Sequence, residues 1–134
     1  MLGLNYYGQA GDGSTTDCLT PTQIFLENVA SQINIGIKDS CILDNLSDLW
    51  CWGNNVWGQL GLVGNNSHEN VPVPQKVTSY QYSFDTSKIS LVYFHTLLVN
   101  DDDNIVMGMG RNFDGQLGVG DNTSRNTPTL LPGF

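Results

Sequence analysis

Short apolar segments alternate with polar turns along the middle of the chain. Residues 33–37, 41–43 and 49–52 are rich in β-branched, aromatic or other large apolar side chains, and another such segment follows Pro74. Clusters of Gly, Asn, Asp and Pro separate these segments, which is typical of short strands joined by turns. A weak helical spacing at residues 22–29 is not repeated elsewhere, so we expect a loop there. The pattern predicts an all-β chain built from units of four antiparallel strands.

Three decapeptides resemble one another. Residues 2–11, 52–61 and 109–118 all contain the pattern Gly-x-Asn-x-x-Gly-Gln-x-Gly, and a proline follows each one downstream, at Pro21, Pro74 and Pro128. The Gly-Gln pairs begin at Gly8, Gly58 and Gly115, and so lie 50 and 57 residues apart. Repeats of this length are typical of propeller blades rather than of helical solenoids.

The glycines of the second copy predict a special backbone. We expect positive φ angles or close backbone approach at Gly53, Gly58, Gly61 and Gly64, because only glycine enters those conformations without penalty. No helix is predicted after any of the glycine pairs, and a phosphate-binding loop needs one. These glycines therefore indicate structural turns, and no cofactor-binding residue is expected.

The order of motifs resembles a known repeat family. His95-Thr96, then Asn104-Ile-Val, then the third decapeptide and Thr127-Pro128 are similar to the repeat of the regulator of chromosome condensation family. The resemblance implies a circular β-propeller, usually of seven four-stranded blades.

On that basis the chain is a single incomplete propeller arc over residues 1–134, with units of about 1–50, 51–107 and a partial 108–134. A ring of seven such units would need well over twice this length. Three explanations stay open: a fragment of a longer propeller protein, a homo-oligomer that completes a ring, and an open arc that another protein covers. Each leaves strand edges exposed to further pairing.

Charge narrows the classes of partner. Five basic residues are scattered among 13 acidic ones, for a net charge of −8, whereas nucleic acids and anionic membranes attract clustered Lys and Arg. No apolar run approaches the roughly 20 residues of a membrane-spanning helix. We therefore expect a protein partner, with no nucleic acid and no membrane. The resemblance also implies an inserted wedge in members that act on small GTPases, and no such insertion is visible here.

The chain contains three cysteines. Cys41 and Cys51 flank a predicted turn symmetrically, close enough in principle for a disulfide. The resemblance implies that both cysteines are common in bacterial relatives, but two free thiols packed as small apolar groups are an open alternative. Cys18 is left over in either case, and we expect an exposed thiol. The compartment, cytoplasmic or extracellular, depends on whether the pair is bridged.

Candidate chemistry is sparse. No catalytic or metal-ligating residue is expected, because no nucleophile motif is present and the acidic run 101–103 aligns with a hairpin tip rather than a calcium loop. Trp57, His68 and Arg125 lie in predicted loops and are the candidate partner-binding residues. The sequence thus predicts a protein-protein interaction module rather than an enzyme. The alternatives are a nucleotide-exchange or regulatory factor for a small GTPase and an extracellular adhesive repeat.

Overall fold

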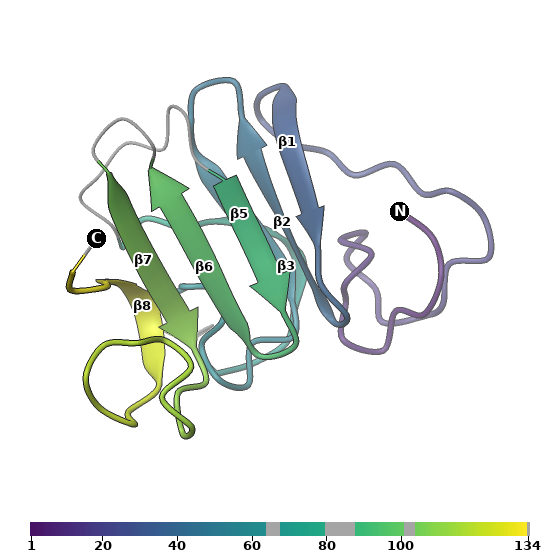
Figure 1. The fold of residues 1–134 in the computed structure, drawn as a ribbon. Coiled ribbons are helices and arrows are strands. Elements are labelled where there is room, and N and C mark those ends of the chain that lie inside the picture. The colour runs from purple at the N-terminus through teal and green to yellow at the C-terminus, as the bar shows by residue number, and fades with distance from the viewer. Residues whose placement is uncertain (64–67, 80–87, 101–103, 134) are drawn as a thin grey trace.

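The structure, a computed structural model, describes residues 1–63, 68–79, 88–100 and 104–133, and these residues form eight β-strands and no helix. Two four-stranded antiparallel sheets contain the strands (Figure 1). Sheet one consists, in order, of β1 (Ala30–Ile35), β2 (Asp39–Asp44), β3 (Leu49–Gly53) and β4 (Val71–Lys76). Sheet two consists of β5 (Lys88–Val92), β6 (His95–Asn100), β7 (Ile105–Gly110) and β8 (Arg125–Leu130). The prediction of an all-β chain with four-stranded antiparallel sheets is confirmed.

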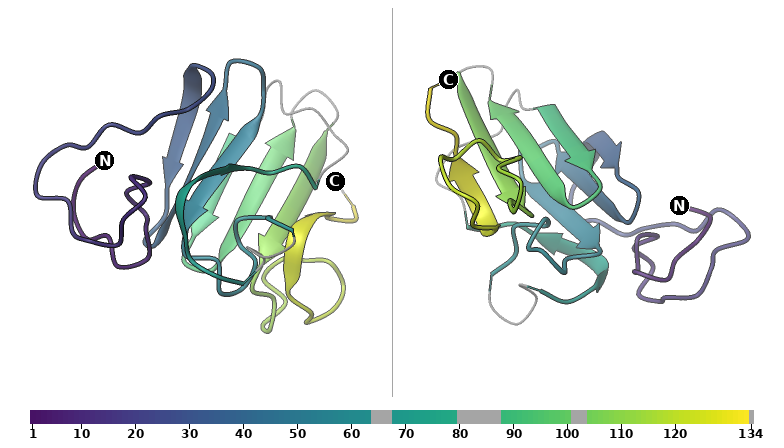
Figure 2. Two further views of the ribbon diagram at one scale, coloured as in Figure 1. Left: turned by 180° about the vertical axis from the view of Figure 1, so that it is seen from behind. Right: turned by 60° about the horizontal axis from the view of Figure 1, so that its bottom comes forward.

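We call the sheets blade 1 and blade 2; they pack against each other (Figure 2). β4 contains Pro74, whereas the sequence placed this strand after the proline. Proline is tolerated because β4 is the last strand of its sheet, where the missing backbone N–H removes no bond from an inner ladder. A shift in the β3–β4 register between Cys51 and Gly53 accompanies it.

The hydrophobic core lies between the two blades. Its buried side chains come from both sheets and from the segments beside β4: Cys41, Leu43, Leu49, Cys51, Leu60, Leu62, Val71, Val77, Ile89, Leu98, Met107 and Met109. Burial of apolar surface on this scale is the main force that holds one blade against the next. The relative position of the loops on adjacent blades therefore follows from the core.

Corresponding strands of the two blades differ in burial. All six residues of β2 are buried, whereas β6 alternates between half-buried and buried positions. β2 has neighbours on both faces: blade 2 covers Cys41 and Leu43, and the first decapeptide reaches the other face at Ser40. In the described part of the chain, β6 is covered on the blade 1 side alone, where Thr96 and Leu98 lie.

A disulfide joins β2 to β3. Cys41 and Cys51 lie directly opposite each other in the ladder, with 2.09 Å between the sulfur atoms and 4.2 Å between the α-carbons. Cys18 is free, but it is buried, and the expectation of an exposed thiol is wrong. The reason is a short backbone bridge to Gly3, which carries Cys18 beneath the first decapeptide and places its Sγ 3.4 Å from Asp12 Oδ2.

Thiol titration checks this arrangement. Without reductant, the denatured chain should expose one titratable thiol, Cys18, and after reduction it should expose three, because the other two are bridged. The native chain should react slowly even at Cys18, since its thiol is buried. Three thiols in the unreduced denatured protein would contradict the bridge.

Candidate functional site

The three decapeptides fold in the same way. Gly8, Gly58 and Gly115 have φ angles of 77°, 76° and 74°. In each copy the asparagine Oδ1 accepts the backbone N–H five residues later, over 2.8 Å in the first copy and 2.9 Å in the other two. The predicted positive φ is confirmed at Gly53, Gly58 and Gly61, and Gly64 lies outside the described residues. One local rule thus sets the shape of all three loops.

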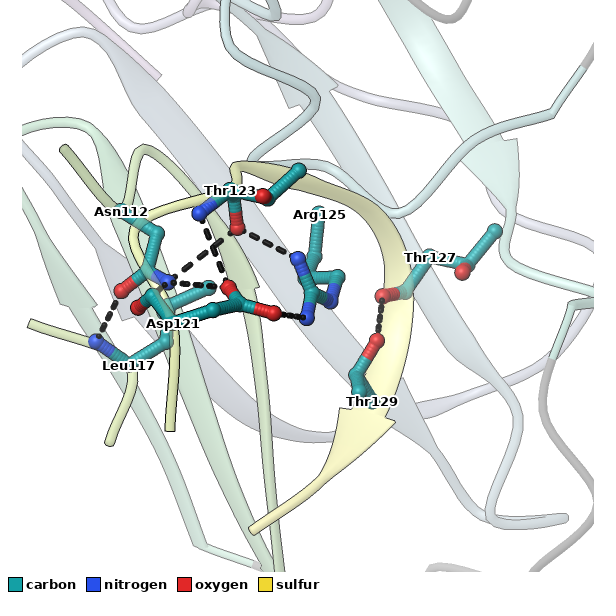
Figure 3. A network of polar contacts seen from close by, with 7 residues as sticks. All are labelled: Asn112, Leu117, Asp121, Thr123, Arg125, Thr127 and Thr129. Atoms are coloured by element: carbon teal, nitrogen blue, oxygen red, sulfur yellow. Dashed lines mark hydrogen bonds and ion pairs between the residues drawn. The ribbon is translucent and has the colours of Figure 1, made fainter. Parts of the chain in front are cut away.

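Figure 3 shows how the third copy is closed. Asn112 Nδ2 donates to the carbonyl oxygens of Asp121, at 2.8 Å, and Thr123, at 3.1 Å. Arg125 donates to the Asp121 carboxylate at 2.7 Å and to the Thr123 carbonyl at 2.5 Å. The hydrogen bond from Arg125 is the largest influence that lowers the pKa of Asp121. Arg125, one of the candidate partner-binding residues, is therefore engaged within its own loop.

The first and second decapeptides each dock on the blade that follows them. A β-carbon at Gly8 would lie 2.5 Å from Pro72 Cα, and one at Gly58 would lie 2.5 Å from Asn126 Cα. The glutamine carbonyls accept hydrogen bonds from equivalent positions of β2 and β6: Ser40 Oγ donates to Gln9 at 3.1 Å, and Thr96 Oγ1 donates to Gln59 at 2.7 Å. Because the two contacts match, successive units meet in one fixed geometry.

This docking gathers aromatic rings at one end of the blades, the lower end in Figure 1, where the decapeptides and the β1–β2 and β5–β6 turns lie. The rings are contributed by all three decapeptides and by the β5–β6 turn, and two cations lie over them. We call this set the aromatic row: Tyr6, Tyr7, Lys38, Trp57, Tyr93, Phe94, Arg111 and Phe113.

Ring contacts link separate repeats within the row. The Trp57 centroid lies 5.0 Å from that of Phe113 and 6.5 Å from that of Phe94. Trp57 is half-buried by these contacts, while Tyr6 is 73% and Phe113 is 51% exposed. Large rings that stay accessible beside polar loops are typical of protein-binding surfaces.

A groove lies beside the row. Lys38, Tyr7 and Phe94 line it together with Val56, and so do the exposed residues His68 and Glu69. The structure thus brings Trp57 and His68, two of the three candidates, to the same region, and it leaves Arg125 in the loop of the third copy. Most of the row was missed by the sequence analysis. The available signal was an aromatic residue in every copy at the two positions between Asn and Gly-Gln.

Asp39, which follows Lys38 in the sequence, is a buried carboxyl group. It begins β2, is 2% exposed, and its Oδ1 has no hydrogen-bond partner. Burial raises the pKa of Asp39 to about 6. A hydrogen bond with Gln59 lowers this pKa, but its effect is smaller. His95 starts β6 at the equivalent place, and burial lowers its pKa. Burial therefore shifts both groups toward their neutral forms relative to the unfolded chain.

The pH dependence of folding should reveal Asp39. A carboxyl whose folded pKa lies above 3.8 holds its proton more tightly in the folded state, so stability falls as pH rises from about 4 through 6. We expect Asp39→Asn to remove this loss. The difference in unfolding free energy between variant and parent should grow by about 2 kcal/mol between pH 4 and 7.5. Urea unfolding at both pH values measures it. Exposed Glu27→Gln serves as the control, and equal pH profiles of Asp39→Asn and parent would contradict the assignment.

Other chemistry has little support in the described residues. No group of three or more His, Cys, Asp or Glu side chains among them could hold a metal ion, and Asp101–Asp103 lie outside the described residues. Within the same ranges, no helix is long and apolar enough to cross a membrane.

Sequence comparisons link the chain to known proteins. The family model of the Regulator of chromosome condensation (RCC1) repeat matches residues 47–99. The Ultraviolet-B receptor UVR8 of Arabidopsis thaliana is 34% identical over 131 residues, which cover 96% of this chain and 29% of the receptor. The X-linked retinitis pigmentosa GTPase regulator of Homo sapiens is 33% identical over 113 residues, covering 82% of this chain and 10% of that protein. The chain thus spans less than a third of either relative.

Solved structures share the fold. Yeast RCC1 (Prp20) in its complex with Kap60 superposes with a TM-score of 0.85 at 21% identity, over 98% of this chain and 32% of that one. Prp20p of Saccharomyces cerevisiae, crystallised and tested for binding to Gsp1p and histones, superposes with a TM-score of 0.79 at 22% identity. The match covers 98% of this chain and 33% of that one. The likeness confirms the predicted fold class: the two sheets are blades of an open β-propeller arc.

Proposed function

Because the chain belongs to the Regulator of chromosome condensation (RCC1) repeat family, we propose that it is a protein-interaction module and that the aromatic row is its binding surface. The observation that carries the proposal is the gathering of rings from successive repeats at one end of the blades. Exposed aromatic side chains bury large areas at small entropic loss, and they dominate the affinity of many interfaces. A structural neighbour is also a protein-binding propeller, since yeast RCC1 (Prp20) binds Kap60.

A comparative affinity purification tests the proposal. The parent chain and a Phe94→Ser/Phe113→Ser variant are immobilised and exposed to lysate of cells that express the protein, and bound proteins are quantified by mass spectrometry. We expect at least one protein to bind the parent and to be lost from the variant, because the variant removes apolar contacts from the row. Leu19→Ser/Phe25→Ser, which changes exposed apolar residues outside the row, should retain it. Identical sets of bound proteins on parent and row variant would contradict the proposal.

A second candidate function is regulation of a small GTPase. The observation that favours it is the 33% identity to a GTPase regulator over 113 residues. The measurement is release of a fluorescent guanine nucleotide from a panel of small GTPases with and without the chain. Acceleration of release from any member would support an exchange factor, whereas unchanged rates across the panel would leave the interaction module as the better account.

An extracellular adhesive role is favoured by the buried Cys41–Cys51 disulfide, because such bonds persist in oxidising compartments. Alkylation of free thiols in intact cells before lysis distinguishes the compartments: the pair is protected in an oxidising one and alkylated on denaturation in a reducing one. Completion of a ring by self-association stays a prediction, and light scattering of the purified chain measures it.

A further inference from the structure

We propose that the groove beside the aromatic row binds an acidic segment of the protein partner, with an Asp or Glu carboxylate on Lys38 and a neighbouring apolar side chain on Phe94 and Val56. This inference rests on the proposed interaction function and adds the chemistry of the partner. The groove is lined by residues of the first decapeptide, the β1–β2 turn, the second decapeptide, residues 68–70 before β4, and the β5–β6 turn. It therefore exists because two blades are docked together.

Lys38 is held in place by aromatic rings. Its Nζ lies 4.6 Å from the ring centroid of Tyr7, 5.5 Å from that of Tyr93 and 5.4 Å from that of Phe94. Interaction with the Tyr7 side chain is also the largest influence that raises the pKa of Lys38. Cation–π contacts of this kind fix the position of the ammonium group without neutralising its charge. The group is thus preorganised for an anion.

The charge of Lys38 is not compensated by an ion pair within the described residues. Lys76, Arg111 and Arg125 pair with Asp48, Asp114 and Asp121 respectively. Lys38 has rings as neighbours instead, in a chain whose net charge is −8. A carboxylate from a partner would form a charge-assisted hydrogen bond with this ammonium group, and such bonds are stronger than those between neutral groups.

The other residues of the groove determine which side chains can lie beside the partner's carboxylate. Phe94 and Val56 supply apolar surface next to Lys38, and Glu69 on the groove lining repels a second acidic group. The partner segment that fits therefore combines one carboxylate with an adjacent aromatic or aliphatic residue rather than a run of acids. A basic segment would face the Lys38 ammonium group at close range.

Selection from a phage-displayed library of disulfide-cyclised random nonapeptides tests the inference. The immobilised chain is the target, and Lys38→Met is the counter-target. Because the net charge of −8 attracts basic peptides nonspecifically, enrichment of acidic peptides would report the local site. We expect the selected peptides to carry Asp or Glu next to Phe, Leu or Met. The best peptide, synthesised with Glu and with Gln at that position, should bind the parent about tenfold more tightly in its Glu form.

Two lysine variants test whether the preference for Glu depends on Lys38. Lys38→Met should abolish the preference for Glu over Gln, whereas Lys76→Met, which makes the same charge change at a residue paired with Asp48, should keep it. Selected peptides that require Phe94 and Phe113 but lack acids would overturn this inference and leave the proposed binding surface intact. Equal binding of the Glu and Gln peptides, or failure to enrich any peptide, would also overturn it, while the lysate comparison tests the interaction function separately.

Discussion

Replacing Gly58 by alanine should destabilise the fold by about 3 kcal/mol or more. The left-handed conformation, φ 76°, costs alanine about 1–2 kcal/mol. In addition, the new methyl group would lie 2.5 Å from Asn126 Cα, so one blade must shift from the next, and such overpacking adds about 1–3 kcal/mol. Urea unfolding followed by Trp fluorescence measures the loss, since Trp50 and Trp52 are buried in blade 1.

Gly115→Ala is the matched control for this prediction. Gly115 has the same place in the third decapeptide and a φ of 74°, but an added β-carbon there meets no atom within 4 Å. Gly115→Ala should therefore lose only the stability that the left-handed conformation costs alanine, about 1–2 kcal/mol. Similar losses for the two variants would show that the second decapeptide is not docked on blade 2.

Asn112→Ala should destabilise the fold by about 3 kcal/mol, because it removes one side chain that serves several backbone groups at once. Asn112 is fully buried; it accepts the Leu117 N–H and donates to the carbonyls of Asp121 and Thr123. Alanine would leave these groups without their partner while the loop that they close remains in place. The same unfolding assay measures the loss.

Asn122→Ala removes an asparagine of the same loop that is exposed and donates to Phe113 O at 2.7 Å. Its loss should stay below about 1 kcal/mol, since water can replace that bond. If Asn112→Ala proved as mild as Asn122→Ala, the third copy would not be held by its asparagine, and the shared rule for the three loops would be wrong.

The fold was largely accessible from the sequence because its signals are local and repeated. Glycine at a fixed place in each copy, an asparagine five residues before an amide that it binds, and short apolar segments between turns each act within a few residues. Errors arose where a distant contact decided the outcome. Cys18 was expected at the surface, but its backbone bridge to Gly3 buries it.

The candidate site was less accessible, for a related reason. Trp57 was selected as a single loop residue, but its role in the row depends on Phe94 in the β5–β6 turn and Phe113 in the third decapeptide. Nothing in the sequence marked Lys38 as a binding residue, because a single lysine in a turn is common. Its importance depends on the rings that surround it in the fold. Only docking of one unit on the next creates these neighbours, and that docking is a tertiary property.

The packing of successive repeats side by side, which unites their loops in one surface, can be measured directly by nuclear Overhauser effects between assigned aromatic side chains. Trp57 and Phe113 belong to the second and third decapeptides, 56 residues apart in the sequence, and their ring centroids lie 5.0 Å apart. The account predicts cross-peaks between the indole protons of Trp57 and the ring protons of Phe113 in the folded chain. Their absence from a fully assigned spectrum would contradict it.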